Sequence, residues 1–181
     1  LGNDEIEGGT GNDKLNGHNG NDILKGELGN DELRGSNGND ILDGGIGQDK
    51  LYGGNDNDVL DGGASYDILY GGNGADLLVA SVGFDLLNGG RGDDTFQLDD
   101  LSAIENTIVR FKAGEDSIDL SEIIDDFSVE VNEFIDNLSL DYSARNTAEL
   151  NYTDGTTEIT FFHFTHIARD LEADDLDIIT T

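Results

Sequence analysis

The sequence predicts an all-β fold made of short parallel strands, and three features of its first half carry that prediction. An aspartate recurs every nine residues from Asp4 to Asp94, eleven times without a slip. A large apolar residue stands two positions after each aspartate, from Ile6 to Phe96, and glycines flank most of these positions. A unit so short and so rich in glycine disfavours any helix, whereas its apolar residue and two neighbours can form one short strand. The aspartates are Asp4, Asp13, Asp22, Asp31, Asp40, Asp49, Asp58, Asp67, Asp76, Asp85 and Asp94.

The glycines between the strands predict how the chain turns. Glycine adopts backbone angles that other residues avoid, so a glycine-rich segment can reverse the chain after every strand. Two nine-residue units then complete one circuit of 18 residues, and stacked circuits form two parallel sheets around a narrow apolar stripe. One circuit cannot bury its own apolar side chains, so the repeats are stable only as a stack. We predict that this stack spans Leu1–Gln97.

Stacking creates an electrostatic problem that points to a ligand. Aspartates from loops one circuit apart would lie roughly 4.8 Å from one another, which is the spacing between strands. Like charges at this separation repel, and the turn carbonyls beside them add partial negative charge. A hard divalent cation between successive loops reverses the sign of these interactions. Calcium fits this role because it takes about six to eight oxygen ligands in flexible geometry, and the loops offer carboxylate and carbonyl oxygens.

The unit Gly-Gly-x-Gly-x-Asp-x-U-x, in which U is a large apolar residue, resembles the nonapeptide of the RTX (repeat-in-toxin) family. The resemblance implies a right-handed parallel β-roll with calcium held between loops one circuit apart. In that family the earlier loop gives its aspartate and the carbonyls four and two residues before it. The later loop gives its aspartate and the carbonyls five and three residues before it. Carried over, one ion would be shared by Asp13, Gly9, Gly11, Asp31, Gly26 and Leu28, and another by Asp22, His18, Gly20, Asp40, Gly35 and Asn37.

The resemblance also implies the number of ions and the remaining ligands. The eleven loops form a column of six and a column of five, so ions between successive loops would number up to nine Ca²⁺. Besides the aspartates, the implied ligands bind through their backbone oxygens. They are Gly2, Gly9, Gly11, Gly17, His18, Asn19, Gly20, Gly26, Glu27, Leu28, Gly29, Gly35, Ser36, Asn37, Gly38, Gly44, Gly45, Ile46, Gly47, Gly53, Gly54, Asn55, Gly62, Gly63, Ala64, Gly71, Gly72, Asn73, Gly74, Gly89 and Arg91.

Some loops depart from the repeat. Asp56 and Ser65 replace the glycine two residues before the aspartate of their loops, and Ala80 and Ser81 replace a glycine pair. We expect calcium to bind these loops less tightly or not at all.

Residues 98–181 break the nine-residue period, and we predict that they cap the open end of the stack and carry a secretion signal. Asn106–Phe111 and Ser117–Leu120 read as strands with a turn between them. This segment resembles the sequence that closes the roll in RTX proteins, with Asn106 and Arg110 where that motif has acids. Some relatives hold a last calcium ion with acids at the places of Asp99 and Asn106, which makes Asp99 a further candidate ligand.

The rest of this region predicts a small cap. Glu122–Leu138 fits one or two short helices with an apolar face. The expected strands are Ser139–Tyr142, Ala148–Tyr152 and Thr157–Phe164, the last two joined by a hairpin turn at Thr153-Asp-Gly-Thr156. Phe161, Phe162 and Phe164 should form an apolar cluster against the open end. The acidic and then hydrophobic end, Asp174–Thr181, resembles the tail of type I secretion substrates.

Composition excludes several classes of function. The net charge of −31 opposes nucleic-acid binding, which needs positive charge. No apolar run approaches the roughly 18 residues of a membrane span, and the absence of cysteine excludes disulfides and thiolate metal sites. No hydrolase, zinc-protease or nucleotide-binding motif occurs, and we expect His163 and His166 to have a structural role. The start inside a repeat suggests a piece of a longer chain.

These features predict a calcium-dependent folding and secretion module of an extracellular bacterial protein, such as a cell-surface adhesin. We expect a monomeric, non-catalytic module that is unfolded at low cytosolic calcium, exported by the type I secretion machinery and folded by calcium outside. An alternative is a polysaccharide-binding module of an extracellular enzyme such as an alginate epimerase, although the positions directly after each aspartate show no continuous basic stripe. Ice binding is a third alternative, but the outward positions lack a regular Thr or Asn array.

Overall fold

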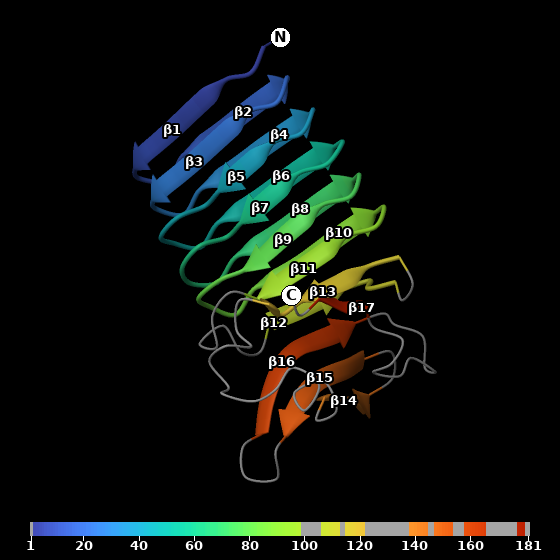
Figure 1. The fold of residues 1–181 in the computed structure, drawn as a ribbon. Coiled ribbons are helices and arrows are strands. Elements are labelled where there is room, and N and C mark those ends of the chain that lie inside the picture. Colours follow the sequence, from blue (N-terminus) through green and yellow to red (C-terminus); the bar gives the residue numbers. More distant parts are fainter. Residues whose placement is uncertain are drawn as a thin grey trace.

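A computed structural model describes residues 2–98, 106–112 and 115–121, and it describes the backbone of four further strands. Short strands dominate the described chain (Figure 1). The strands are β1 (Glu5–Thr10), β2 (Lys14–Asn19), β3 (Ile23–Leu28), β4 (Glu32–Asn37), β5 (Ile41–Asp43), β6 (Lys50–Asn55), β7 (Val59–Asp61), β8 (Ile68–Asn73), β9 (Leu77–Ala80), β10 (Leu86–Arg91), β11 (Thr95–Leu98), β12 (Asn106–Val109), β13 (Ser117–Asp119), β14 (Leu138–Ala144), β15 (Thr147–Thr153), β16 (Glu158–Thr165) and β17 (Asp177–Ile179).

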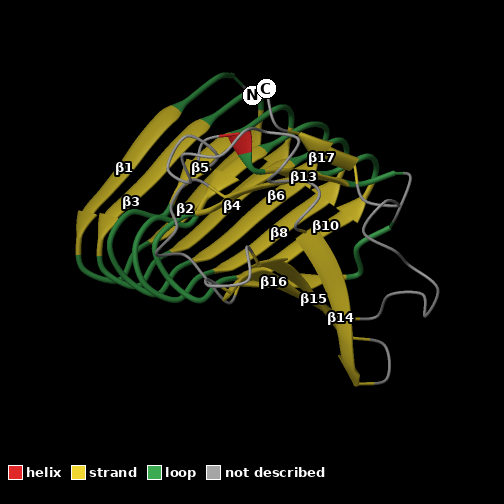
Figure 2. Ribbon diagram, turned by 60° about the horizontal axis from the view of Figure 1, so that its bottom comes forward, coloured by secondary structure: helices red, strands yellow, loops and turns green. Residues whose placement is uncertain are grey.

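The strands alternate between two sheets. One sheet has the order β1-β3-β5-β7-β9-β11-β13-β17, and the other runs β14-β15-β16-β12-β10-β8-β6-β4-β2. All pairings from β1 to β13 are parallel, and those within the repeats join residues 18 apart, such as Leu15 with Leu33. The connecting loops gather along the edges of the two sheets (Figure 2). The predicted all-β stack of parallel strands is therefore confirmed.

Several strands are longer than the three residues that the repeat predicts. The strands β2, β4, β6, β8 and β10 each contain six residues, whereas β5 and β7 contain three. In the longer strands the pairing passes over the glycine four residues after the aspartate and resumes beyond it, as in His18 with Ser36 and Asn19 with Asn37. The glycine segment thus contributes to the sheet as well as to the turn.

The apolar stripe between the sheets is the core of the stack. Its side chains are at most 1% exposed from Leu24 onward and stand two residues after each aspartate. Complete burial of such a side chain contributes roughly 1.5–3 kcal/mol, and each circuit adds two of them. The core members in the repeats are Leu24, Leu33, Leu42, Leu51, Leu60, Leu69, Leu78, Leu87 and Phe96.

The closing segment continues both sheets. Strand β12 pairs with β10 and places Ile108 beside Leu87, and β13 pairs with β11 and places Ile118 beside Phe96. Phe111 packs near Phe96, with ring centroids 6.0 Å apart. Beyond β12 the pairing changes from parallel to antiparallel. Strand β16 is still parallel to β12, whereas β15 is antiparallel to β16 and β14 is antiparallel to β15.

Strands β14, β15 and β16 overlap the three strands expected between Ser139 and Phe164. Residues 122–137 of the expected helical segment, residues 154–156 of the expected hairpin turn and candidate ligand Asp99 lie outside the described residues. The same holds for the side chains of the expected phenylalanine cluster. The remaining residues of the expected helical segment and hairpin turn, Leu138 and Thr153, belong to β14 and β15. Within the described part of the chain, no helix has the length and apolar character to cross a membrane.

Candidate metal centres

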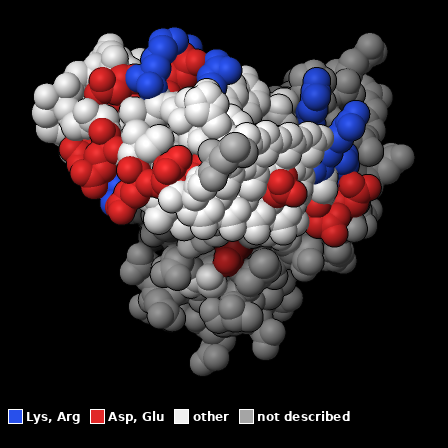
Figure 3. Space-filling model, turned by 90° about the horizontal axis from the view of Figure 1, so that it is seen from above, with Lys and Arg blue, Asp and Glu red and all other residues white. Residues whose placement is uncertain are grey.

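The repeat aspartates lie inside the edges of the roll rather than on its surface. Each one directly precedes a strand, and from Asp22 to Asp94 every repeat aspartate is at most 2% exposed. Figure 3 agrees with this burial, because a broad area of the face seen from above is uncharged despite the large excess of acids in the sequence. The acidic repeat therefore concentrates carboxylates in the interior.

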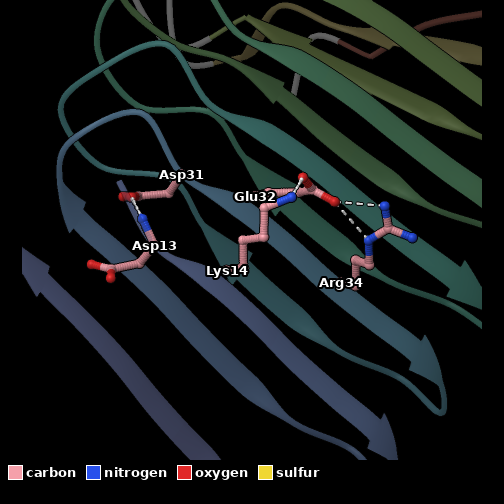
Figure 4. A network of polar contacts seen from close by, with 5 residues as sticks. All are labelled: Asp13, Lys14, Asp31, Glu32 and Arg34. Carbon is pink, nitrogen blue, oxygen red and sulfur yellow. Dashed lines mark hydrogen bonds and ion pairs between the residues drawn. The ribbon is translucent and has the colours of Figure 1, made fainter. Parts of the chain in front are cut away.

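One oxygen of each buried carboxylate is held by the preceding loop of its column. The backbone N–H of each aspartate donates a hydrogen bond to Oδ1 of the aspartate 18 residues later. These nine bonds are 2.6 to 3.1 Å long. The first joins Asp4 to Asp22, and the last joins Asp76 to Asp94. Figure 4 shows one of them, from Asp13 to Asp31. The ladder holds the carboxylates from Asp22 to Asp94 in both columns.

The second oxygen of most of the repeat carboxylates has no hydrogen-bond donor. In eight consecutive loops the Oδ2 atom is buried and accepts no hydrogen bond, in Asp13, Asp22, Asp31, Asp40, Asp49, Asp58, Asp67 and Asp76. A buried polar atom without a partner is costly, and a buried charge is more so. A regular series of such atoms indicates sites that an external group would complete.

Burial also changes the protonation of these groups. Burial raises the pKa of Asp58 and of Asp67 to about 7, and repulsion from neighbouring carboxylates adds to the increase while the backbone hydrogen bond opposes it. Burial likewise raises the pKa of Asp76 and of Asp94 to about 6. Some carboxylates in both columns would therefore be protonated near neutral pH unless a cation compensates their charge.

Glycine leaves an oxygen-lined space beside several of these carboxylates, and two loops illustrate it. A Cβ atom on Gly44 would lie 2.7 Å from Oδ2 of Asp49 and 2.5 Å from the carbonyl oxygen of Gly62. A Cβ atom on Gly8 would lie 3.0 Å both from Oδ2 of Asp13 and from the carbonyl oxygen of Gly26. Each space thus lies between a carboxylate and a carbonyl of the next loop in the column, where any larger residue would intrude.

The donor set fits a hard cation. Among the described residues, no three acidic, histidine or cysteine side chains converge as a ligand group. A cation in these loops must therefore take most of its ligands from backbone carbonyls. Carboxylate and carbonyl oxygens in number are what Ca²⁺ prefers.

The sequence of the repeats matches a known family model. The model for the RTX calcium-binding nonapeptide repeat (4 copies) matches residues 1–33, 34–69 and 70–100, which together make up more than half of the chain. The chain belongs to the RTX calcium-binding repeat family. No curated protein matches the sequence.

Solved structures include relatives of this RTX roll. The solution structure of the AlgE6R3 subunit from the Azotobacter vinelandii mannuronan C5-epimerase is similar with 26% identity and a TM-score of 0.55. That match covers 78% of this chain and 80% of the other. The extracellular lipase LipA from Serratia marcescens matches at 16% identity and a TM-score of 0.33, over 99% of this chain and 38% of the other.

The RTX turns share one backbone conformation at two positions. The residues four and two before each repeat aspartate from Asp13 to Asp94 have positive φ, and the one exception is Ser81, four residues before Asp85. Non-glycine residues adopt it as well, including His18 with φ of 74°, Asp56 with 74° and Ser65 with 109°. The loops that depart from the repeat at Asp56 and Ser65 therefore keep the same turn. Their aspartates are also as deeply buried as those of the regular loops.

The structure also reveals two column members that the nine-residue period does not contain. The N–H of Asp85 donates to Oδ1 of Asn106 at 2.6 Å, and the N–H of Asp94 donates to Oδ1 of Asp116 at 3.2 Å. Asp116 differs from the repeat aspartates because its Oδ2 accepts a 2.8 Å hydrogen bond from the N–H of Lys112. The available sequence signal is local, since Asn106 and Asp116 stand two residues before the buried Ile108 and Ile118, as a repeat aspartate would.

The outer surface beside one loop column carries ion pairs. Lys14 contacts Glu32 at 2.6 Å, and Arg34 contacts the other oxygen of Glu32 at 2.6 Å (Figure 4). Exposed pairs of this kind contribute little to stability. A metal ion would therefore bind in the buried carboxylate columns and not at the surface acids.

Proposed function

We propose that this chain is a calcium-gated folding and secretion module of a larger extracellular protein, and that this protein is a bacterial cell-surface adhesin. The observation that carries the proposal is the series of buried Oδ2 atoms without hydrogen-bond partners, repeated at the same place in successive loops. The module is non-catalytic in this account, because the periodic carboxylates serve the fold rather than a substrate.

We infer the ligands from the contacts between successive loops. The Oδ2 atom of Asp49 and the carbonyl oxygen of Gly62 approach one space, and they belong to one site in the pattern carried over from the family. Asp13 and Gly26 stand in the same relation. The remaining aspartates and turn carbonyls repeat this arrangement and give up to nine sites. The regular turn and buried carboxylate support including Asp58 and Asp67.

The chain's own residues make its folding conditional. A calcium ion, when bound, supplies two positive charges and several coordination bonds to oxygen at each pair of loops. Without that charge, the two columns hold buried carboxylates whose mutual repulsion and lost hydration oppose folding. The 26 glycines add a large loss of chain entropy on folding. The balance then favours an unfolded chain, as expected for acidic sequences with little apolar burial.

This conditional stability suits export. Extracellular-type calcium sites have Kd values on the order of 10⁻⁴–10⁻³ M, so the loops stay empty at cytosolic calcium levels. The unfolded chain can then pass through the type I secretion machinery. Folding outside the cell, where metal binding and folding are coupled, would keep the exported chain from sliding back. We place the folded module outside the cell as a monomeric part of a longer chain.

A matched pair of substitutions tests the assignment of ligands. Asp40 is buried in a column, whereas Asp43 is exposed on the outer face of the neighbouring strand. Asp40→Ala should raise the calcium concentration at the folding midpoint, measured by circular dichroism. Asp43→Ala should leave that midpoint nearly unchanged, since its removal relieves desolvation and repulsion from Asp61 while it loses attraction to Lys25. Equal midpoints for the two variants would refute the assignment.

A further inference from the structure

Two arginines line one groove near the end of the roll. Arg91 is the last residue of β10, where it pairs with Asn73 of β8. Arg110 directly follows β12, the next strand of the same sheet. Both line a groove with a volume of about 230 Å³, together with Tyr70, Asn73 and Asn88. The groove therefore combines two guanidinium groups with two amides and a phenol.

The positive charge of this groove is uncompensated among the described residues. Lys14, Lys25, Arg34 and Lys112 each make a salt bridge with a glutamate. Arg91 and Arg110 make none with any described carboxylate, although acids outnumber bases in the sequence by 40 to nine. The described residues that line the groove include no aspartate or glutamate. Two arginines that line one groove, with no described acid in its lining, suit a carboxylate or another oxyanion.

Both arginines are departures from the pattern of their surroundings. Asn19, Asn37, Asn55 and Asn73 form a ladder of side-chain hydrogen bonds, each 2.8 Å long, and residue 91 would continue it. The expectation that the roll has no regular Asn array is therefore wrong for this sheet, because alternate repeats lie on the same sheet. Arg91 interrupts that ladder, and Arg110 stands where the closing motif of the family has an acid. Arg110 also has φ of 65°, a left-handed conformation that is uncommon for a residue other than glycine.

The neutral side chains of the groove restrict which chemical groups its ligand can carry. The Oδ1 atom of Asn88 is buried and accepts no hydrogen bond from a described residue. A fully deprotonated oxyanion such as sulfate cannot donate to this acceptor, whereas a hydroxyl group can. The ring of Tyr70 stacks on Tyr52 with centroids 5.3 Å apart and an interplanar angle of 7°, which holds one wall in place. A ligand with a carboxylate for the arginines and hydroxyls for the amides matches this set.

We propose that this groove binds a hydroxylated carboxylate, of the chemical class of a sugar acid, through Arg91 and Arg110. The site goes beyond the proposed calcium function, because it binds through side chains, whereas Asn73 and Arg91 would serve calcium only through their backbone oxygens. The anion interacts with the two guanidinium groups, and Asn88 accepts a hydroxyl hydrogen bond. Because charge-assisted hydrogen bonds dominate, affinity should fall as salt concentration rises.

The test uses the full chain folded in excess calcium, observed by ¹H–¹⁵N spectroscopy during titration with sodium glucuronate at constant ionic strength. Saturable shifts should centre on the Arg91 and Arg110 side chains and on the amides near Asn88. Arg91→Gln and Arg110→Gln should each weaken binding about tenfold, since each removes charge-assisted hydrogen bonds. The control Arg34→Gln removes an arginine that lies over Tyr52 outside the groove, and it should have little effect.

Titrations with glucose and with sodium sulfate test separately whether the carboxylate and the hydroxyl groups of the ligand contribute to binding. Glucose lacks the carboxylate and should bind about tenfold more weakly or not at all. Sulfate lacks hydroxyl donors for Asn88 and should also bind more weakly than glucuronate. Equal binding of sulfate and glucuronate, shifts spread over the surface, or equal loss in Arg34→Gln would overturn the proposal. If Arg110→Gln shows an altered calcium midpoint, Arg91→Gln and the wild-type shifts decide the outcome.

Discussion

The backbone N–H of Asp85 donates a 2.6 Å hydrogen bond to Oδ1 of Asn106, although 21 residues separate them instead of the 18 within the repeats. An asparagine thus occupies the place of the next aspartate in the column. It offers the same acceptor to the preceding loop, but an amide nitrogen replaces the second carboxylate oxygen. In the other column Asp116 takes the equivalent place, and its second oxygen accepts the N–H of Lys112. Each column therefore ends in a group that keeps the ladder and presents no open carboxylate oxygen.

Replacing the end group of this column should loosen the last turn. Asn106 is fully buried, so Asn106→Leu would leave the N–H of Asp85 without this acceptor inside the roll. Loss of such a buried hydrogen bond typically costs about 1–3 kcal/mol. We expect a lower urea midpoint in saturating calcium for Asn106→Leu, whereas Asn106→Asp should stay closer to wild type because it keeps the Oδ1 acceptor. An unchanged midpoint for Asn106→Leu would show that the bond does not support the closing turn.

The repeat could be predicted from the sequence because one short period specifies both the strand and the turn. The residues two after each aspartate, such as Leu42 and Leu60, are the buried core as predicted. The last members of the two columns, Asn106 and Asp116, could not be predicted from the sequence. Their distances from the repeat aspartates break the nine-residue period, and their roles depend on backbone hydrogen bonds. The ladder itself was also missed, because sequence predicts repulsion between stacked aspartates but not that Oδ1 of Asp31 accepts the N–H of Asp13.

The groove at Arg91 and Arg110 could not be predicted from the sequence for a related reason. The positions directly after each aspartate show no basic stripe, and the two arginines come from different parts of the sequence. Only the pairing of β12 with β10 brings Arg110 beside the end of β10. The third position after the aspartate is the informative one on this sheet, because it places Arg34, Tyr52 and Tyr70 in one stack.

Filling one of the glycine spaces should impair folding without changing any charge. In Gly44→Ala the new methyl group would lie 2.7 Å from Oδ2 of Asp49 and 2.5 Å from the carbonyl oxygen of Gly62, which is too close without movement. Overpacking of this kind costs about 1–3 kcal/mol, so the calcium midpoint measured by circular dichroism should rise. Gly2→Ala is the matched control, because a Cβ atom there meets nothing within 4 Å. Similar midpoints for both variants would contradict the proposed role of the space.

Acid should stabilise the calcium-free roll. Burial raises the pKa of Asp58 and Asp67 to about 7, above the value of about 3.9 for an unfolded aspartate. Protonation therefore favours the folded state, a contribution that is fully present below about pH 4 and lost as the pH rises through about 7. In excess chelator, the β signal in circular dichroism should be greater at about pH 5 than at about pH 8.

Asp67→Asn provides the control for this pH effect. The asparagine can still accept the N–H of Asp49 at Oδ1, as Asn106 does for Asp85, but it cannot ionise. The variant should be more folded than wild type in chelator at high pH and should depend less on pH. A β signal that decreases on acidification of the wild-type chain would contradict the cause assigned to the raised pKa values.

The most direct test of the calcium-gated fold is a calcium titration of the full chain, followed by far-ultraviolet circular dichroism at fixed ionic strength and with magnesium as the comparison. Fixed ionic strength keeps general charge screening constant. Each interior loop belongs to two sites of its column, so one bound ion prepares the next, and binding should be cooperative. Magnesium requires nearly octahedral geometry at about 2.0–2.1 Å and gives up its water reluctantly. We predict a largely disordered chain in chelator with excess magnesium, and a gain of β signal over a narrow range of calcium concentration. A gradual curve, or magnesium as effective as calcium, would mean that cations only screen an acidic surface and would contradict the folding switch.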